Sequence, residues 1–243
     1  MKQLQHFFSD KPVASILDVG CGTGDFIKLL DATFEGKVRI TGVDPGEQWL
    51  KEARFRFPQE QIDFVRMSGE QLLFEDASFD VVTLSNALHH LENIEQTLNE
   101  MKRVLKPDGW LLINEISNGE LSPAQENQRM LHHFKSFVDR LHGITHRPTW
   151  TPDEILEIVV QNKLEILDSF LHLKMKTVNR EELFLEDKYR EMASLLEELQ
   201  GRPEFEQTKD QLPLFRDRLT KHGFQTAPQL MVIAKPVLQH KKR

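Results

Sequence analysis

The sequence predicts an α/β protein built around a doubly wound, mainly parallel sheet. Short apolar runs alternate with amphipathic stretches through the first half of the chain, which is the pattern of β-α-β units. A glycine-rich loop, Gly20–Gly24, follows the first apolar run, where a strand would turn into a helix. The chain has 243 residues, of which 39% are apolar, so it is long enough to bury one sizeable core.

Five strands are expected in the first half of the chain. They lie near residues 14–19, 38–43, 62–66, 79–85 and 110–116. The clearest helix between them has apolar residues at i, i+4, i+7 and i+11, namely Ile94, Leu98, Met101 and Leu105. The run Lys106-Pro107-Asp108-Gly109 is expected to end that helix and to turn the chain.

The second half of the chain is predicted to be mainly helical. Ser122-Pro123 and Thr151-Pro152 each combine an N-cap with a proline at the first helical position and a capping-box partner. The first of these helices should end before Gly143 and the second near Asn162. A strand near 164–174, helical patterns over 185–199 and 205–219, and a last strand over 230–234 complete the expected order.

Charge and composition argue against several classes of protein, including nucleic-acid-binding and membrane-spanning proteins. The net charge is −7, and residues 1–120 carry 12 basic against 20 acidic side chains, which disfavours binding to a phosphate backbone. There is no run of 18 apolar residues, and the first residues do not resemble a signal peptide, so no membrane segment and a cytoplasmic location are expected. Cys21 is the only cysteine, which excludes an internal disulfide and a cysteine-rich zinc site.

The loop from Asp18 to Asp25 carries an acid at each end. A P-loop requires Lys and then Ser or Thr after its last glycine, but Gly24 is followed by Asp25. A dinucleotide fingerprint would need its third glycine at that same position. Because both acids would repel a pyrophosphate at the start of the following helix, we expect the loop to hold a ligand that carries positive charge.

The segment Asp18-Val19-Gly20-Cys21-Gly22-Thr23-Gly24 resembles the first motif of class I S-adenosylmethionine-dependent methyltransferases, whose cofactor carries a sulfonium and an ammonium group. Asp44 ends the second predicted strand, where a carboxylate can accept bonds from both ribose hydroxyls. The segment from Phe64 to Leu91 is similar to the third and fourth strands of the small-molecule, type 11-like branch, and Lys106–Trp110 resembles its turn into the fifth strand. The resemblance covers residues 14–118.

The resemblance implies that S-adenosylmethionine is the cofactor and that its binding residues follow the ends of the predicted strands. They are expected to be Asp18, Gly20, Cys21, Gly22, Gly24, Asp44, Pro45, Ser68, Gly69, Glu70 and Asn86. Ser68 stands where this family usually has an acid that accepts the adenine amino group. Its hydroxyl, Gly69 or Glu70 are the alternatives for that contact.

Methyl transfer from such a cofactor needs alignment and a dry site, and it needs a base only when the acceptor arrives protonated. His89, His90 and Glu115 are the candidates for that base. Adjacent residues seldom face one site, so at most one of the two histidines is expected to take part.

The resemblance also implies the arrangement of the chain. We expect a single methyltransferase domain over 1–243, with a Rossmann-like sheet of seven strands in which the seventh is antiparallel between the fifth and the sixth. Within it, a cofactor-binding core spans 10–118, a helical lid 119–150, and a C-terminal part 151–243 with a helical insertion at about 178–224. The lid is expected because only about thirteen residues precede the first strand, where relatives often have a covering helix.

The expected function is methyl transfer to a small molecule, because the acidic charge disfavours nucleic acid and the inserted helices can close a pocket. A tRNA or protein methyltransferase, a non-catalytic S-adenosylmethionine-binding protein and an NAD oxidoreductase are the alternatives. His132, His133, His142 and His146 show no regular ligand spacing, so no metal is expected. Phe134, Phe137 and Trp150 fit core packing and the cover of an apolar substrate equally well, and the oligomeric state is left open.

Overall fold

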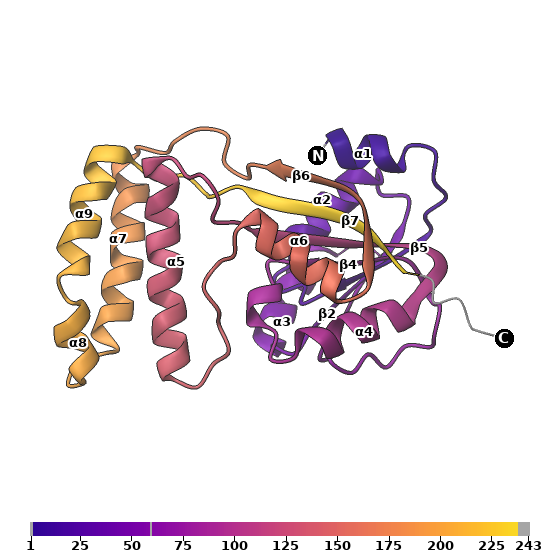
Figure 1. The fold of residues 1–243 in the computed structure, drawn as a ribbon, viewed down its shortest axis with the longest axis horizontal. Coiled ribbons are helices and arrows are strands. Elements are labelled where there is room, and N and C mark those ends of the chain that lie inside the picture. The colour runs from indigo at the N-terminus through magenta and orange to yellow at the C-terminus, as the bar shows by residue number, and fades with distance from the viewer. Residues whose placement is uncertain (1, 59, 238–243) are drawn as a thin grey trace. The chain divides into compact units, whose positions relative to one another are not determined.

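A computed structural model describes residues 2–58 and 60–237 of the chain (Figure 1). In this part of the chain, seven strands form one sheet in the order β3-β2-β1-β4-β5-β7-β6. The strands are β1 (Ser15–Val19), β2 (Arg39–Asp44), β3 (Ile62–Arg66), β4 (Phe79–Ser85), β5 (Leu105–Ile116), β6 (Leu164–His172) and β7 (Gln229–Pro236). The first five pair in parallel, and β7 is the antiparallel strand between β5 and β6. The fold predicted from the sequence is confirmed.

The strand β1 is an inner strand of the sheet, between β2 and β4, and its residues are buried on both faces. Leu17 and Val19 point to one face and Ile16 to the other, and all three are buried. The pairing register sets Asp18 beside Gly42 of β2 and beside Thr83 of β4. The carboxyl ends of β1, β2 and β4 therefore meet at one edge of the sheet.

The helices are α1 (Lys2–Phe8), α2 (Asp25–Thr33), α3 (Glu47–Arg56), η1 (Leu88–His90, a 3₁₀ turn), α4 (Ile94–Val104), α5 (Pro123–Leu141), α6 (Pro152–Gln161), α7 (Glu182–Glu197), α8 (Pro203–Thr208) and α9 (Gln211–His222). On one face of the sheet, α1, α2 and α3 share a core with alternate strand residues. On the other face α4 packs against β4, and Lys102 of α4 donates to the carbonyl of Asn162 just after α6. None of the helices in the described residues has the length and the apolar content needed to cross a membrane.

The chain forms two compact units. Within the described residues, the first unit contains the chain up to Glu115, then Ile155–Phe170, and the chain from Leu230 onward, and so it holds most of the sheet. The second unit consists of Ile116–Glu154 and Leu171–Gln229. In the second unit α5, α7 and α9 pack against one another around a core that includes Phe215, and α8 precedes α9 (Figure 1).

The helices α5 and α6 begin where the sequence indicates. The Ser122 hydroxyl accepts a bond from the Gln125 N–H, and the Gln125 side chain accepts one from the Ser122 N–H, which is the predicted capping box. Thr151 and Glu154 make the same exchange at the start of α6.

Three local features differ from the sequence-based expectation. The first thirteen residues contain the short helix α1, whose Leu4 and Phe8 are buried in the sheet core. The segment 106–109 is a bulge inside β5, because Leu105 already pairs with Phe79 before Trp110 pairs with Val81. The pattern over 205–219 is two helices, because the ring of Pro213 would clash with the carbonyl of Lys209 in a continuous helix.

Candidate active site

The loop between β1 and α2 is held in a tight turn by its glycines. Gly20, Gly22 and Gly24 all have positive φ, between 50° and 85°. A Cβ on Gly20 would lie 2.8 Å from the Cβ of Ala87, and one on Gly24 would lie 2.6 Å from the ring of Phe57. A Cβ on Gly22 would meet no atom within 4 Å. The space beside Gly22 is therefore open, and a ligand can approach the backbone there.

Asp18 is a buried carboxylate at the end of β1. Its Oδ1 accepts a hydrogen bond from the Thr83 hydroxyl, which the strand register places beside it. Its Oδ2 is buried and has no hydrogen-bond partner among the described residues. Burial, helped by the nearby negative charge of Asp44 and opposed by the Thr83 hydrogen bond, raises the pKa of Asp18 to about 7. This oxygen is a polar group for which the chain itself supplies no partner, so it suits a cationic ligand group.

Asp44 joins the glycine loop to the end of β2. Its Oδ2 accepts the Gly22 N–H at 2.9 Å, and its Oδ1 accepts the Gly46 N–H at 2.8 Å. Next to it, the carbonyl of Pro45 accepts a bond from Nε of Arg66 at 3.1 Å. Each oxygen of Asp44 keeps one further lone pair, so the carboxylate is fixed in place and can still accept two hydroxyls.

Asp25 does not contribute the uncompensated charge that the sequence indicated. Its carboxylate pairs with the guanidinium of Arg56 at 2.8 Å, and Arg56 also donates to the carbonyl and hydroxyl of Thr23. The expectation that the loop holds a cation therefore depends on Asp18 and Asp44. Arg56 comes from α3, 31 residues after Asp25, and no local pattern in the sequence connects the two.

Cys21 is a packing residue of the loop. Burial raises the pKa of its thiol, and the neighbouring Asp18 and Asp44 raise it further, so the thiol stays protonated. Its sulfur fills the space above Gly42, where a Cβ would lie 2.8 Å from Sγ.

In the turn after β3, the side chains of Ser68 and Glu70 form hydrogen bonds within the chain. The Ser68 hydroxyl accepts the Glu70 N–H at 3.2 Å, and the Glu70 carboxylate accepts the Asn93 N–H at 3.0 Å, at the start of α4. A Cβ on Gly69 would lie 2.7 Å from the Val19 side chain. The Glu70 side chain is thus directed to α4, while the Ser68 hydroxyl can still form a further bond.

The segment after β4 brings together two of the three candidate catalytic residues. Nδ1 of His89 lies 2.7 Å from Oε1 of Glu115, and both side chains are buried. The other oxygen of Glu115 accepts the Leu88 N–H at 3.0 Å, so the carboxylate is held by two bonds. His90 is exposed, and its ring packs against that of His89 at a tilt of 45°, with centroids 4.2 Å apart. Asn86, just before this turn, has a φ of 48° and donates its N–H to the carbonyl of Asn114.

The aromatic residues of the second unit are both core and pocket residues. Phe134 is buried in the core of α5, α7 and α9, and Phe137 packs against that core. Both also line a pocket of about 790 Å³ in this unit. Its other lining residues are Glu126, Arg129, Met130, His133, Gln207, Thr208, Gln211, Leu214 and Arg218. Trp150 instead forms a backbone bridge with Ser117.

Comparison with known proteins gives the same assignment for the first half of the chain. Residues 17–113 match the family model described as a methyltransferase domain. The chain is 36% identical over 117 residues to a ubiquinone/menaquinone biosynthesis C-methyltransferase of Brucella anthropi, covering 46% of this chain and 44% of that protein. It is 31% identical over 148 residues to a demethylmenaquinone methyltransferase of Chlorobaculum tepidum, covering 60% and 58%. The chain thus spans about half the length of the curated relatives that it matches.

A solved structure shows the same fold over nearly the whole chain. An S-adenosylmethionine-dependent methyltransferase from Geobacter sulfurreducens, in complex with S-adenosylhomocysteine, aligns with a TM-score of 0.57 at 16% identity. The alignment covers 97% of this chain and 89% of that structure. The motif order from Asp18 to Gly109, the sheet order and the match to the family model agree: residues 17–113 match a methyltransferase domain and are similar to class I, S-adenosylmethionine-dependent methyltransferases.

Proposed function

We propose that this chain transfers a methyl group from S-adenosylmethionine to a small-molecule nucleophile. The observation that carries the proposal is the buried Oδ2 of Asp18, which has no partner in the described part of the chain and lies at the strand edge that also holds Asp44. A sulfonium cofactor with an ammonium group supplies the cation that such a carboxylate lacks. The open space beside Gly22 admits it to the backbone.

The residues at the strand edge are proposed to bind different parts of the cofactor. Asp18 attracts the cationic methionine part, and Asn86 contributes to the same side. Asp44 accepts the two ribose hydroxyls, next to Pro45. Ser68 is the proposed contact for the adenine, because the Glu70 side chain is already bonded to α4 and a side chain at Gly69 would clash with Val19.

The cofactor supplies an already activated methyl group, so the protein has to orient the acceptor, exclude water and remove a proton where the acceptor carries one. We propose His89 as that base and Glu115 as its positioning residue. A carboxylate at Nδ1 fixes the ring with its proton on Nδ1, which leaves the lone pair of Nε2 to accept a proton. His90 is exposed and its ring packs against that of His89, so we assign it no catalytic role.

A small molecule is favoured as the acceptor by the acidic charge of residues 1–120, which disfavours RNA. The names of the matched relatives support the same choice, since they act in ubiquinone and menaquinone biosynthesis. Reduced quinone precursors are therefore the first acceptors to test. The helical segments 119–150 and about 178–224 are proposed as the part that contacts the acceptor.

The proposal is tested by incubating the full chain with methyl-labelled cofactor and three separate fractions: low-mass metabolites with added demethylmenaquinol, RNA, and protein. We expect label only in a low-mass product, and we expect Asp44→Ala to abolish most of it. Label in the RNA or protein fraction would establish the corresponding alternative. Tight cofactor binding by calorimetry with no labelled product in any fraction would indicate a non-catalytic binding protein.

A further inference from the structure

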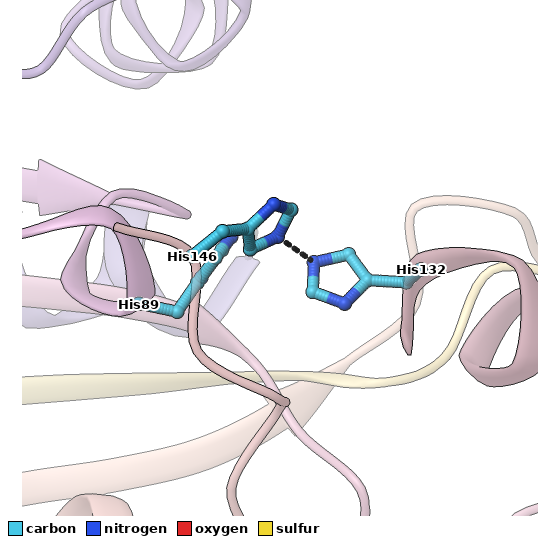
Figure 2. A group of neighbouring side chains, drawn as sticks. All are labelled: His89, His132 and His146. Atoms are coloured by element: carbon cyan, nitrogen blue, oxygen red, sulfur yellow. Dashed lines mark hydrogen bonds between the residues drawn. The ribbon is translucent and has the colours of Figure 1, made fainter. Parts of the chain in front are cut away.

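We propose that His132 and His146, in the second unit, form a binding site for a divalent transition-metal ion. His132 lies on α5, and His146 lies in the loop that follows this helix. Their Nε2 atoms are 3.3 Å apart, and their rings meet nearly at a right angle, with an interplanar angle of 82° (Figure 2).

The separation of the two nitrogens fits a shared metal ion. Zinc binds imidazole nitrogen at about 2.0–2.1 Å, and the edge of a tetrahedron with such bonds is about 3.3–3.4 Å. The pair of histidines therefore already has the spacing of two ligands on one ion. Without a metal, the same two atoms share one proton in a hydrogen bond, and the ion would replace that proton.

A carboxylate orients one of the two rings. Oδ2 of Asp139 lies 2.6 Å from Nδ1 of His146, so it fixes the proton of the neutral ring on Nδ1. Nε2 of His146 then has its lone pair directed toward His132. A carboxylate on the outer nitrogen of a ligating histidine is the usual outer contact of protein metal sites, and it increases the basicity of the ligand. Lys135 also pairs with Asp139, at 2.8 Å, and holds the carboxylate in position.

The backbone of His146 is fixed onto α5 as well. Its carbonyl accepts bonds from the Ser136 hydroxyl and from the Arg140 guanidinium, each at 2.8 Å. The side chain of His146 is buried, while that of His132 is partly exposed. Because His146 is held this firmly, it loses little conformational freedom on binding an ion, which favours a site over an incidental contact.

The donor set selects the kind of ion. Imidazole nitrogen suits Zn²⁺, Co²⁺, Ni²⁺ and Cu²⁺, whereas Mg²⁺ and Ca²⁺ require oxygen ligands. Water or other donors of the chain would complete the coordination. The sequence does not reveal the pair, because His132 and His146 are fourteen residues apart and each stands near another histidine.

The test is a titration of the metal-free full chain with Co²⁺, whose visible absorption reports tetrahedral nitrogen ligation, followed by competition with Zn²⁺. We expect one equivalent to bind. His132→Gln should weaken binding at least tenfold, and Asp139→Ala should weaken it about 10-fold to 100-fold. His142→Gln is the matched control, because this histidine is exposed on the same segment and pairs with Glu198 instead.

A thermal measurement gives a second readout of metal binding with the same variants. Zn²⁺ should raise the Tm of the wild-type chain and of His142→Gln, and it should leave that of His132→Gln unchanged. Co²⁺ binding or a Zn²⁺-dependent Tm rise that is the same in His132→Gln and wild type would overturn the proposal. So would the absence of both effects in the wild-type chain, whatever the outcome of the methyl-transfer assay.

Discussion

Replacing Asp18 by Asn should stabilise the ligand-free protein, and it should do so more at pH 8 than at pH 5. Burial raises the pKa of this carboxyl from 3.8 to about 7. At 1.36 kcal/mol per pH unit, keeping it ionised in the folded state costs about 4 kcal/mol. Because the folded chain holds this proton more tightly than the unfolded chain, the stability contributed by Asp18 falls as the pH rises from about 4 to about 7. The neutral amide removes that dependence.

The measurement is urea unfolding of the wild type and Asp18→Asn at both pH values. We expect the free energy of unfolding of the variant to exceed that of the wild type by about 4 kcal/mol at pH 8 and by about 1–2 kcal/mol at pH 5. The slope of the transition should stay the same. Asp63→Asn, at an exposed position of β3, controls for the change in net charge. An equal gain at both pH values, or the same gain in the control, would refute the reasoning.

Three further predictions concern the same strand edge. Asp44→Ala should weaken cofactor binding by about 1.5–3 kcal/mol, because it removes charge-assisted hydrogen bonds, and unchanged calorimetric affinity would show that the ribose is held elsewhere. His89→Gln should lower kcat, because it removes the proposed base, whereas His90→Gln should leave kcat unchanged; equal losses would contradict the assignment of the base. Gly20→Ala should destabilise the protein more than Gly22→Ala in urea unfolding, because only the former adds a contact of 2.8 Å to the strain of a positive φ, and the reverse order would contradict the described packing.

The fold could be predicted because local patterns determine its elements. Strands that are buried on both faces appear in the sequence as apolar runs, as the buried residues Ile16, Leu17 and Val19 show. The helix starts at Ser122 and Thr151 follow from caps that act within four residues. The break between α8 and α9 could also have been found, because Pro213 acts on the carbonyl four residues before it.

The residues of the candidate site were predictable only where their place at the end of a strand determines their location. Asp18, Gly22 and Asp44 lie at strand ends, so the parallel sheet brings them together. The pairing of Asp25 with Arg56 depends on how α3 packs, and no periodicity reports it. For this reason the sequence-based argument counted the charges of both Asp18 and Asp25, although Arg56 neutralises that of Asp25.

The same physical feature connects the stability of Asp18 with its proposed role. A buried carboxylate without a partner for Oδ2 destabilises the ligand-free fold when it is ionised, and a bound cation would recover that free energy. Binding of a cationic cofactor should therefore favour the ionised form and release a proton below pH 7. Asn at this position would stabilise the fold and weaken the cofactor complex, so an acid here is explained by binding and not by folding.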